Sequence, residues 1–363
     1  MKFLRLAFYV LIAQLVLSGC AGEGVEETSS SSSSEINFDA YLGRNASTRS
    51  SVTNITSLKG KEFNSGFGVF ARYNHTNGAT SPLMDNEHVT WKGDHWGYEH
   101  TRYWPNEGTV DFYAFAPRVE SVILVNKPKE NNPNPTYIEF TSSKSPVDLV
   151  WGVQPGQKAP KSSTDGKVKF EFKHALARLG FDITANQELV ENGAVIKVEE
   201  VKLYGYSDDK GAFDIKGYLN LENGTWSVGD PNISTRVVYT WTPTGAEDGI
   251  NYKLSASQLD HTCKKIENAP NSYLCIIPQV KYNPFYLQIT YKVQQGTFEE
   301  KEKVTVKKNL LEVLQPGVSN PSFEFVKGKA YVFHLKLSLD PVNFSVSPDV
   351  DNWDVVNNET MFL

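Results

Sequence analysis

Apolar and polar residues alternate along several stretches of this chain. Residues 167–174 (KVKFEFKH), 285–293 (FYLQITYKV) and 332–339 (VFHLKLSL) all place apolar side chains at every second position. A period of two predicts strands with one buried face and one exposed face. Such strands are typical of antiparallel sheets that pack face to face.

Helical patterns are few. Residues 174–181 (HALARLGF) and 254–260 (LSASQLD) predict about two helical turns each, which is too short for an isolated helix to be stable. The 17 tyrosines and 20 phenylalanines, against only three methionines, favour strands over helical bundles. We therefore predict an all-β fold built of antiparallel β-sandwiches.

The length of the chain predicts two domains. About 330 residues follow the N-terminal segments described below, which is more than one core usually serves. A turn-rich stretch at 154–167 (QPGQKAPKSSTDGK) separates two strand-rich halves. We place an N-terminal β-sandwich domain at 36–160 and a C-terminal one at 161–363. No short internal repeat is visible, which argues against a solenoid or a propeller.

The N-terminus has the pattern of a lipoprotein signal peptide. Lys2 and Arg5 precede an apolar stretch that runs to Leu17, and small residues then lead to Cys20 in the sequence LSGC. The apolar stretch is shorter than the roughly 20 residues that span a bilayer. We predict a signal peptide at 1–19 and a lipid on Cys20. The alternative is an ordinary secretory signal in which the cysteine occurs by chance.

Residues 20–35 are predicted to be a flexible tether, because they are polar and acidic and include six consecutive serines. Removal of residues 1–19 takes away two of the 36 basic residues and none of the 42 acidic ones, so 34 remain against 42 and the formal charge becomes −8. This charge, with no basic stripe in the sequence, argues against a nucleic-acid-binding protein.

The sequence shows no catalytic motif. It lacks a Gly-x-Ser-x-Gly elbow, a glycine-rich phosphate loop, a His-Glu-x-x-His pair and a Cys-x-x-Cys pair. His88, His95 and His100 stand near acidic residues, but their spacings of seven and five match no compact zinc motif. No carboxylate pair is singled out for glycoside hydrolysis. We expect no enzyme activity, no cofactor and no metal site.

The same stretch, residues 87–105, is rich in aromatic residues: Trp91, Trp96, Tyr98, Tyr103 and Trp104. Trp and Tyr bury large areas in the cores of β-sandwiches, so we predict that the three tryptophans are mainly structural. The alternative is that flat rings on the surface stack against sugars. The protein would then be a monomeric surface lipoprotein that binds glycans.

Two further cysteines, Cys263 and Cys275, lie twelve residues apart. A disulfide that closes this loop would contribute about 3 kcal/mol in the chain-entropy picture. Cys275 also lies within an apolar run, SYLCIIPQ, where it could serve as a small buried residue. Both interpretations remain open.

A series of motifs in fixed order covers nearly all of the chain beyond the tether: 103–117 (YWPNEGTVDFYAFAP), 148–152 (DLVWG), 172–183 (FKHALARLGFDI), 273–279 (YLCIIPQ) and 328–355 (GKAYVFHLKLSL…VSPDVDNWDV). This series resembles the fimbrillin-like (Mfa-like) family of Bacteroidales, which is related to the subunits of type V pili. One departure is Cys275, where the family has an aliphatic residue. The resemblance implies two transthyretin-like antiparallel β-sandwich domains in tandem.

The resemblance also implies maturation by an arginine-specific protease that cuts after the first N-terminal strand. Residues 36–42 (INFDAYL) can form that strand, and Arg44 and Arg49 follow it. The sequence TRSSV resembles the family's cleavage region more than GRNA does, so we expect cleavage after Arg49 first and after Arg44 second. The alternative is an uncleaved loop with solvated arginines.

Removal of one strand uncovers unpaired backbone groups, which a strand from another subunit can fill. The resemblance implies that the C-terminal segment donates this strand, with Val342, Phe344 and Val346 filling pockets. The implied partners are other fimbrial subunits, the outer membrane through the lipid, and glycans or proteins on other surfaces. The implied location is the cell outer membrane, and the fimbrium after maturation.

Overall fold

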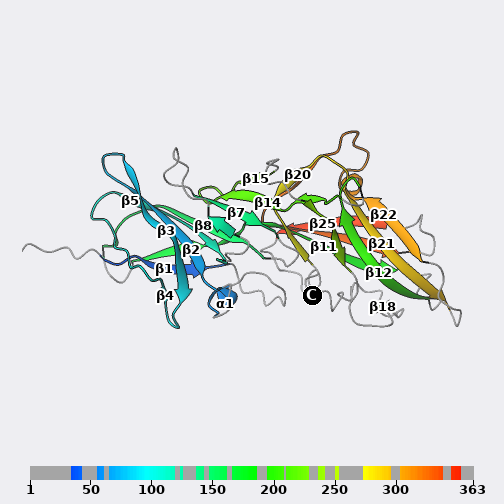
Figure 1. Ribbon diagram of the computed structural model, residues 1–363, viewed down its shortest axis with the longest axis horizontal. Coiled ribbons are helices and arrows are strands. Elements are labelled where there is room, and N and C mark those ends of the chain that lie inside the picture. Colours follow the sequence, from blue (N-terminus) through cyan, green and yellow to red (C-terminus); the bar gives the residue numbers. More distant parts are fainter. Residues whose placement is uncertain are drawn as a thin grey trace, which may run out of the picture. The chain divides into compact units, whose positions relative to one another are not determined.

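The structure, a computed structural model, describes residues 34–42, 55–60, 65–118, 123–125, 136–142, 147–161, 166–185, 194–207, 210–228, 236–241, 250–252, 273–295, 303–337 and 345–352. These residues belong to one compact unit, residues 33–363. They consist mainly of strands, arranged in several largely antiparallel sheets (Figure 1). The predicted all-β class is confirmed.

The described part of the chain has two short helices, α1 (Ile55–Leu58) and α3 (Leu310–Leu314). Asn309 caps the second helix, since its side-chain oxygen accepts a hydrogen bond from the N–H of Leu311. Neither helix has the length or the apolar character that a bilayer crossing requires.

The first sheet has eight strands in the order β10-β8-β5-β2-β3-β4-β1-β9. Their bounds are β1 (Asn37–Tyr41), β2 (Phe67–Asn74), β3 (Thr80–Trp91), β4 (Trp96–Gly97), β5 (Thr109–Ala116), β8 (Val150–Gln157), β9 (Lys167–Glu171) and β10 (Lys173–His174). Strands β9 and β10 are consecutive in the chain but lie at opposite ends of this order. The sheet therefore bends round until its two ends meet at residues 167–174, and it encloses a core.

That first core contains side chains from β1, β2, β3, β4, β5, β8 and β9 and from residues between these strands. Its largest members are aromatic: Phe38, Phe67, Trp96, Trp104, Phe112, Phe170 and Phe172. Strand β5 is buried on both faces, because Phe112 belongs to this core while Tyr113 and Phe115 belong to a separate cluster. Burial on both faces explains why β5, TVDFYAFA, is almost continuously apolar.

The separate cluster also includes residues of a four-stranded sheet, β15-β14-β7-β6. Its strands are β6 (Ile123–Val125), β7 (Tyr137–Thr141), β14 (Lys216–Asn220) and β15 (Trp226–Val228). Strand β7 pairs with β14, and β9 and β10 pair with strands of the first sheet. Strands that precede residue 160 therefore pair with strands that follow it. The division into domains at 36–160 and 161–363, and their transthyretin-like organisation, stay predictions.

A second sandwich encloses the core whose largest side chains include Phe213, Phe285, Tyr291, Phe325 and Phe333. One of its sheets has the order β19-β11-β24-β25, and the other has β17-β12-β21-β22 with β18 also paired to β12 (Figure 1). The bounds are β11 (Ala177–Ala185), β12 (Ala194–Tyr204), β17 (Tyr239–Trp241), β18 (Ile250–Tyr252), β19 (Tyr273–Ile276), β21 (Tyr286–Gln295), β22 (Val304–Asn309), β24 (Lys329–Leu337) and β25 (Ser345–Asn352).

Two small ribbons complete the described strands. Strand β13 (Phe213–Asp214) pairs with β16 (Arg236–Val237), and β20 (Gln279–Lys281) pairs with β23 (Phe323–Phe325). Both pairs are antiparallel.

The three strands predicted from alternation are confirmed. Residues 167–174 form β9 and β10, residues 285–293 fall in or next to β21, and residues 332–337 form most of β24. The helix predicted at 174–181 is wrong, because these residues form β10 and the start of β11. Strand β11 lies between β19 and β24, and pairing on both sides outweighs a weak helical propensity. The other predicted helix, 254–260, lies outside the described residues.

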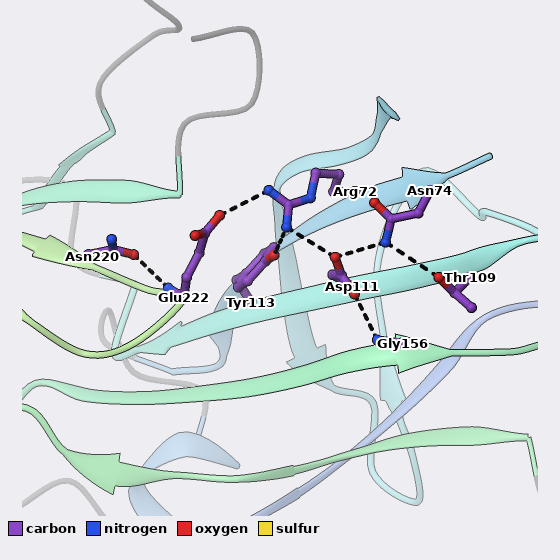
Figure 2. A network of polar contacts seen from close by, with 8 residues as sticks. All are labelled: Arg72, Asn74, Thr109, Asp111, Tyr113, Gly156, Asn220 and Glu222. Atoms are coloured by element: carbon purple, nitrogen blue, oxygen red, sulfur yellow. Dashed lines mark hydrogen bonds and ion pairs between the residues drawn. The ribbon is translucent and has the colours of Figure 1, made fainter. Parts of the chain in front are cut away.

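A polar network joins β2 and β5 to the turn between β14 and β15 (Figure 2). The guanidinium of Arg72 donates to Asp111 at 3.0 Å, to the hydroxyl of Tyr113 at 2.6 Å and to Glu222 at 2.9 Å. The N–H of Gly156 donates to Asp111 at 2.7 Å. The backbone of Gly156 has a φ of 64°, which lies in the left-handed region that favours glycine. The hydrogen bond to Asp111 therefore holds an irregular part of β8 in place.

Asp111 is the centre of this network. Burial alone would raise the pKa of its carboxyl, but hydrogen bonds from Asn74, from Gly156 and from Arg72 outweigh burial and lower the pKa below its ordinary value. A carboxylate with a lowered folded-state pKa stabilises the fold at pH values above its unfolded pKa. That contribution is lost as the pH falls through the folded-state pKa.

We predict that Asp111→Asn lowers the free energy of unfolding by about 1 to 3 kcal/mol near neutral pH, because the Arg72 guanidinium loses a charged partner. The difference between wild type and variant should begin to shrink as the pH falls below about 4, where the carboxyl of the unfolded chain becomes protonated, and should be lost as the pH falls through the lower folded-state pKa. Urea unfolding at a series of pH values measures this. A difference that stays constant down to about pH 2 would contradict the role of Asp111.

Candidate functional site at strand β1

Strand β1 lies inside the first sheet, between β4 and β9. It is antiparallel to β4, where Phe38 faces Trp96, and parallel to β9, from Asn37 opposite Lys167 to Tyr41 opposite Glu171. The strand therefore fills a slot with a neighbour on each side. Its removal would expose two new sheet edges.

Backbone contacts fasten both ends of β1. The N–H of Ile36 donates to the carbonyl of Arg102 at 2.9 Å, and the N–H of Phe172 donates to the carbonyl of Tyr41 at 2.8 Å. The hydroxyl of Tyr98 also donates to the carbonyl of Ile36 at 2.8 Å. Without β1 the N–H of the buried Phe172 would lose the carbonyl of Tyr41 as its partner, and a buried backbone group left unpaired costs free energy.

The side chains of β1 alternate between the core and the surface. Phe38 and the two residues that flank the strand, Ile36 and Leu42, are buried, with exposures of 1%, 1% and 7%. The Phe38 ring lies 5.5 to 6.3 Å, between centroids, from the rings of Phe67, Tyr98, Phe112 and Phe170. Phe38 is thus at the centre of the first core, although it belongs to a short strand near the N-terminus.

Several predicted site residues cannot be placed. The lipidation site Cys20, the cleavage sites Arg44 and Arg49, the disulfide candidate Cys263 and the donor-strand residues Val342 and Phe344 lie outside the described residues. Lipidation and cleavage therefore stay predictions. In the sequence, the two arginines follow β1 and precede α1.

The third donor-strand candidate, Val346, is described. It lies in β25, opposite Leu335 of β24 in the same chain. The hydrogen-bonded ladder of β24 and β25 extends from Lys336 opposite Ser345 to Lys329 opposite Asn352. The part of the donor segment from Ser345 to Asn352 is thus engaged within the second sandwich.

Cys275 has a free thiol that is buried next to Ile277. Burial raises the pKa of this thiol well above its ordinary value, and the negative charge of Asp148 raises it further. The interpretation of Cys275 as a small buried residue is confirmed. Its pairing with Cys263 stays untested.

The histidines of residues 87–105 contact different partners. His88 lies 3.0 Å from the carbonyl of Ser65, while His95 contacts the neighbouring Asp94 at 2.6 Å. His100 lies 3.4 Å from Glu87. Within the described ranges, no three His, Cys, Asp or Glu side chains are grouped so that they could hold a metal ion.

The tryptophans of this stretch are mostly in the core. Trp96 and Trp104 are buried, with exposures of 2% and 4%, and Trp91 is partly buried against Trp96. The prediction of a structural role is confirmed for Trp96 and Trp104. Tyr103, at 51% exposed, is the most exposed aromatic ring of the five.

The sequence did not reveal that β1 pairs with β9, which follows it by about 130 residues. Nor did it reveal that this pairing is parallel. A weak signal exists, since residues 36–42 and 167–172 share the same alternation of apolar and polar positions. Alternation does not identify the partner of a strand, so only the three-dimensional arrangement places β1 within the sheet.

The fold and the site define a class: an all-β protein whose N-terminal strand completes a core and is followed by an arginine-containing segment. The chain belongs to the fimbrillin-like family, whose model matches residues 48–353. It is 24% identical over 375 residues to the fimbrium subunit Fim1C of Phocaeicola vulgatus, covering 95% of each chain. The fold is similar to that of a fimbrial protein from Bacteroides vulgatus (TM-score 0.63, 21% identity), covering 88% of this chain and 99% of the other.

We predict that Phe38→Ala lowers the free energy of unfolding by about 3 to 5 kcal/mol, because it leaves a cavity among four aromatic rings. Tyr41→Ala is the matched control, since Tyr41 lies on the same strand and is 55% exposed. It should change the stability by about 0.5 kcal/mol or less. Equal losses for the two variants in thermal or urea unfolding would show that β1 is not anchored through Phe38.

Proposed function

We propose that this protein is a structural or accessory subunit of a bacterial surface fimbria, exported as a lipoprotein precursor and assembled by strand exchange, which serves adhesion. Membership of the fimbrillin-like family supports a fimbrial role, as does the similarity to a protein named as a fimbrium subunit. Because the fold alone does not fix a function, the local arrangement of β1 has to carry the mechanism.

The single observation that carries the proposal is the position of β1. The strand completes the first core, yet in sequence only residues 42–54 separate it from α1, and Arg44 and Arg49 lie within them. A cut there would leave β1 held by noncovalent contacts alone. The strand could then be exchanged without breaking the chain of the first sandwich.

In the proposed precursor, a lipid on Cys20 anchors the chain to the outer membrane, residues 20–35 act as the tether, and β1 closes the slot. An arginine-specific protease cuts after Arg49, or second after Arg44. This cut separates the sandwiches from the anchor. The slot opens when β1 leaves.

A strand from the C-terminal segment of the next subunit, residues 342–363, then fills the slot. Backbone hydrogen bonds to β4 and β9 would provide affinity, and side chains at alternate positions would fill the core. In this proposal the slot and the donor come from different parts of the chain, so the contact would repeat head to tail and would not close. This geometry builds a fibre, with other fimbrial subunits as partners.

The competing proposal, a monomeric lipoprotein that binds glycans through exposed aromatic rings, has less support. Two of its three candidate tryptophans, Trp96 and Trp104, are buried. Sugar stacking needs an accessible ring face, so this function would have to rely on residues such as Tyr103. Glycans or proteins on other cells remain proposed targets of the assembled fibre.

We predict that the lipidated form depends on Cys20. Cys20→Ala should abolish membrane retention or leave the signal peptide uncut, because a stable anchor needs the acyl chains that this cysteine carries. Membrane fractionation and the mass of the mature chain measure this. Retention and mass equal to those of the wild type would contradict the anchor.

We predict that an arginine-specific protease shortens the mature protein by about 30 residues, the distance from Cys20 to Arg49, and that oligomers resistant to dodecyl sulfate then form. The Arg44→Ala/Arg49→Ala double variant should remain uncut and monomeric, and Arg102→Ala is the control for an exposed arginine outside this segment. Size-exclusion chromatography and gel electrophoresis follow both steps. If the cleaved wild-type protein stays monomeric at high concentration, this result would contradict the proposal and favour the glycan-binding alternative.

A further inference from the structure

The exposed face of β9 carries two lysines. Lys167 and Lys169 are exposed and alternate with Val168 and Phe170, which are buried in the first core. Glu171 follows on the same face, opposite Tyr41, and Lys173 in β10 lies beyond it; the three lysines are called the lysine row below. Residues two apart in a strand are about 6.6 Å apart, so Lys167 and Lys169 stand close enough to act on one strand laid beside them.

Strand β1 meets this row with a single acidic side chain. Its exposed positions are Asn37, Asp39 and Tyr41, and its register places Asp39 opposite Lys169. In a parallel pair, directly paired residues point to the same face of the sheet, so the carboxylate and the ammonium share one exposed surface. If β1 leaves, β9 loses the carboxylate that faces the middle of its lysine row.

The C-terminal sequence has a complementary charge. Residues 337–363 contain five acidic residues and neither lysine nor arginine. Within them, Asn352-Trp353-Asp354-Val355 repeats the order of residue types in Asn37-Phe38-Asp39-Ala40: asparagine, an aromatic residue, aspartate and an aliphatic residue. Laid into the slot in the direction of β1, this segment would bring Trp353 to the position of Phe38 and Asp354 to the position of Asp39.

We infer that the lysine row of β9 selects the strand that refills the slot, and that the occupant is the segment 352–356 of a second copy of this chain, with Asp354 opposite Lys169. The inference rests on the strand exchange proposed above. The inference adds to that proposal the register of the incoming strand and the charged pair, Asp354 with Lys169, that sets this register. Trp353 is larger than Phe38, so the neighbouring aromatic rings would repack around it.

A second segment, Val342-Asn343-Phe344, also resembles the start of β1, Ile36-Asn37-Phe38. Two observations favour 352–356 over it. The residue that would face Lys169 in that register is Ser345, which has no charge. Moreover, β25 (345–352) pairs with β24 along its length, and a donor that begins at Asn352 leaves nearly all of that ladder in place.

The test measures the rate of oligomer formation after Arg-specific cleavage of the full mature chain. Lys169→Glu and Asp354→Lys should each slow assembly by about 10-fold, because opposite charges become like charges. The Lys169→Glu/Asp354→Lys double variant should recover most of the wild-type rate. Lys158→Glu and Glu359→Lys, which change charges outside the pair, are the controls and should each change the rate by less than about 2-fold.

The outcomes separate this inference from the proposed function. If the wild type assembles while Asp354→Lys keeps the wild-type rate, or the double variant shows no recovery, strand exchange stands and the pairing of Lys169 with Asp354 is wrong. If Ser345→Lys slows assembly and Lys169→Glu restores it, the donor is 342–346 instead. Failure of the cleaved wild type to assemble overturns both proposals. Equal melting temperatures of the uncleaved variants establish that each one is folded.

Discussion

The packing of Phe38 into the first core is the interaction on which the rest of this structure depends. Its ring is 1% exposed and contacts four other aromatic rings, three of which come from strands far along the chain. Burial of one such side chain contributes about 1.5 to 3 kcal/mol, and the backbone hydrogen bonds of β1 add to that. The slot of β1 is therefore costly to leave empty, whichever strand fills it.

The closure of the sheet explains why this slot is internal. Residues 167–174 pair with β1 at one end and with β8 at the other, so β1 has neighbours on both sides. If an edge strand left a sheet, its neighbour would become the new edge, and the number of exposed edges would not change. Loss of an internal strand instead separates β4 from β9 and exposes backbone groups on both, which gives an incoming strand two ladders of hydrogen bonds to restore.

Much of the strand content could be predicted from the sequence, because alternation reports burial on one face of a sheet. The apolar positions 168, 170 and 172 illustrate this, and Phe38 shows the same pattern within β1. Pairing could not be predicted, since alternation does not name a partner, and the parallel pairs β1–β9 and β11–β24 join segments about 130 to 150 residues apart. Residues 174–181 have a weak helical pattern but form parts of β10 and β11, because pairing with neighbouring strands outweighs that pattern.

The central claim is that β1 is a replaceable strand, and hydrogen exchange of residues 167–172 tests it most directly. The N–H of Phe172, which donates to Tyr41, reports on the slot. The account predicts that these amides are protected in the uncleaved precursor, exchange rapidly in cleaved monomers freed of residues 20–49, and are protected again in the oligomer. Equal protection in all three forms would contradict the claim, because the slot would then never have opened.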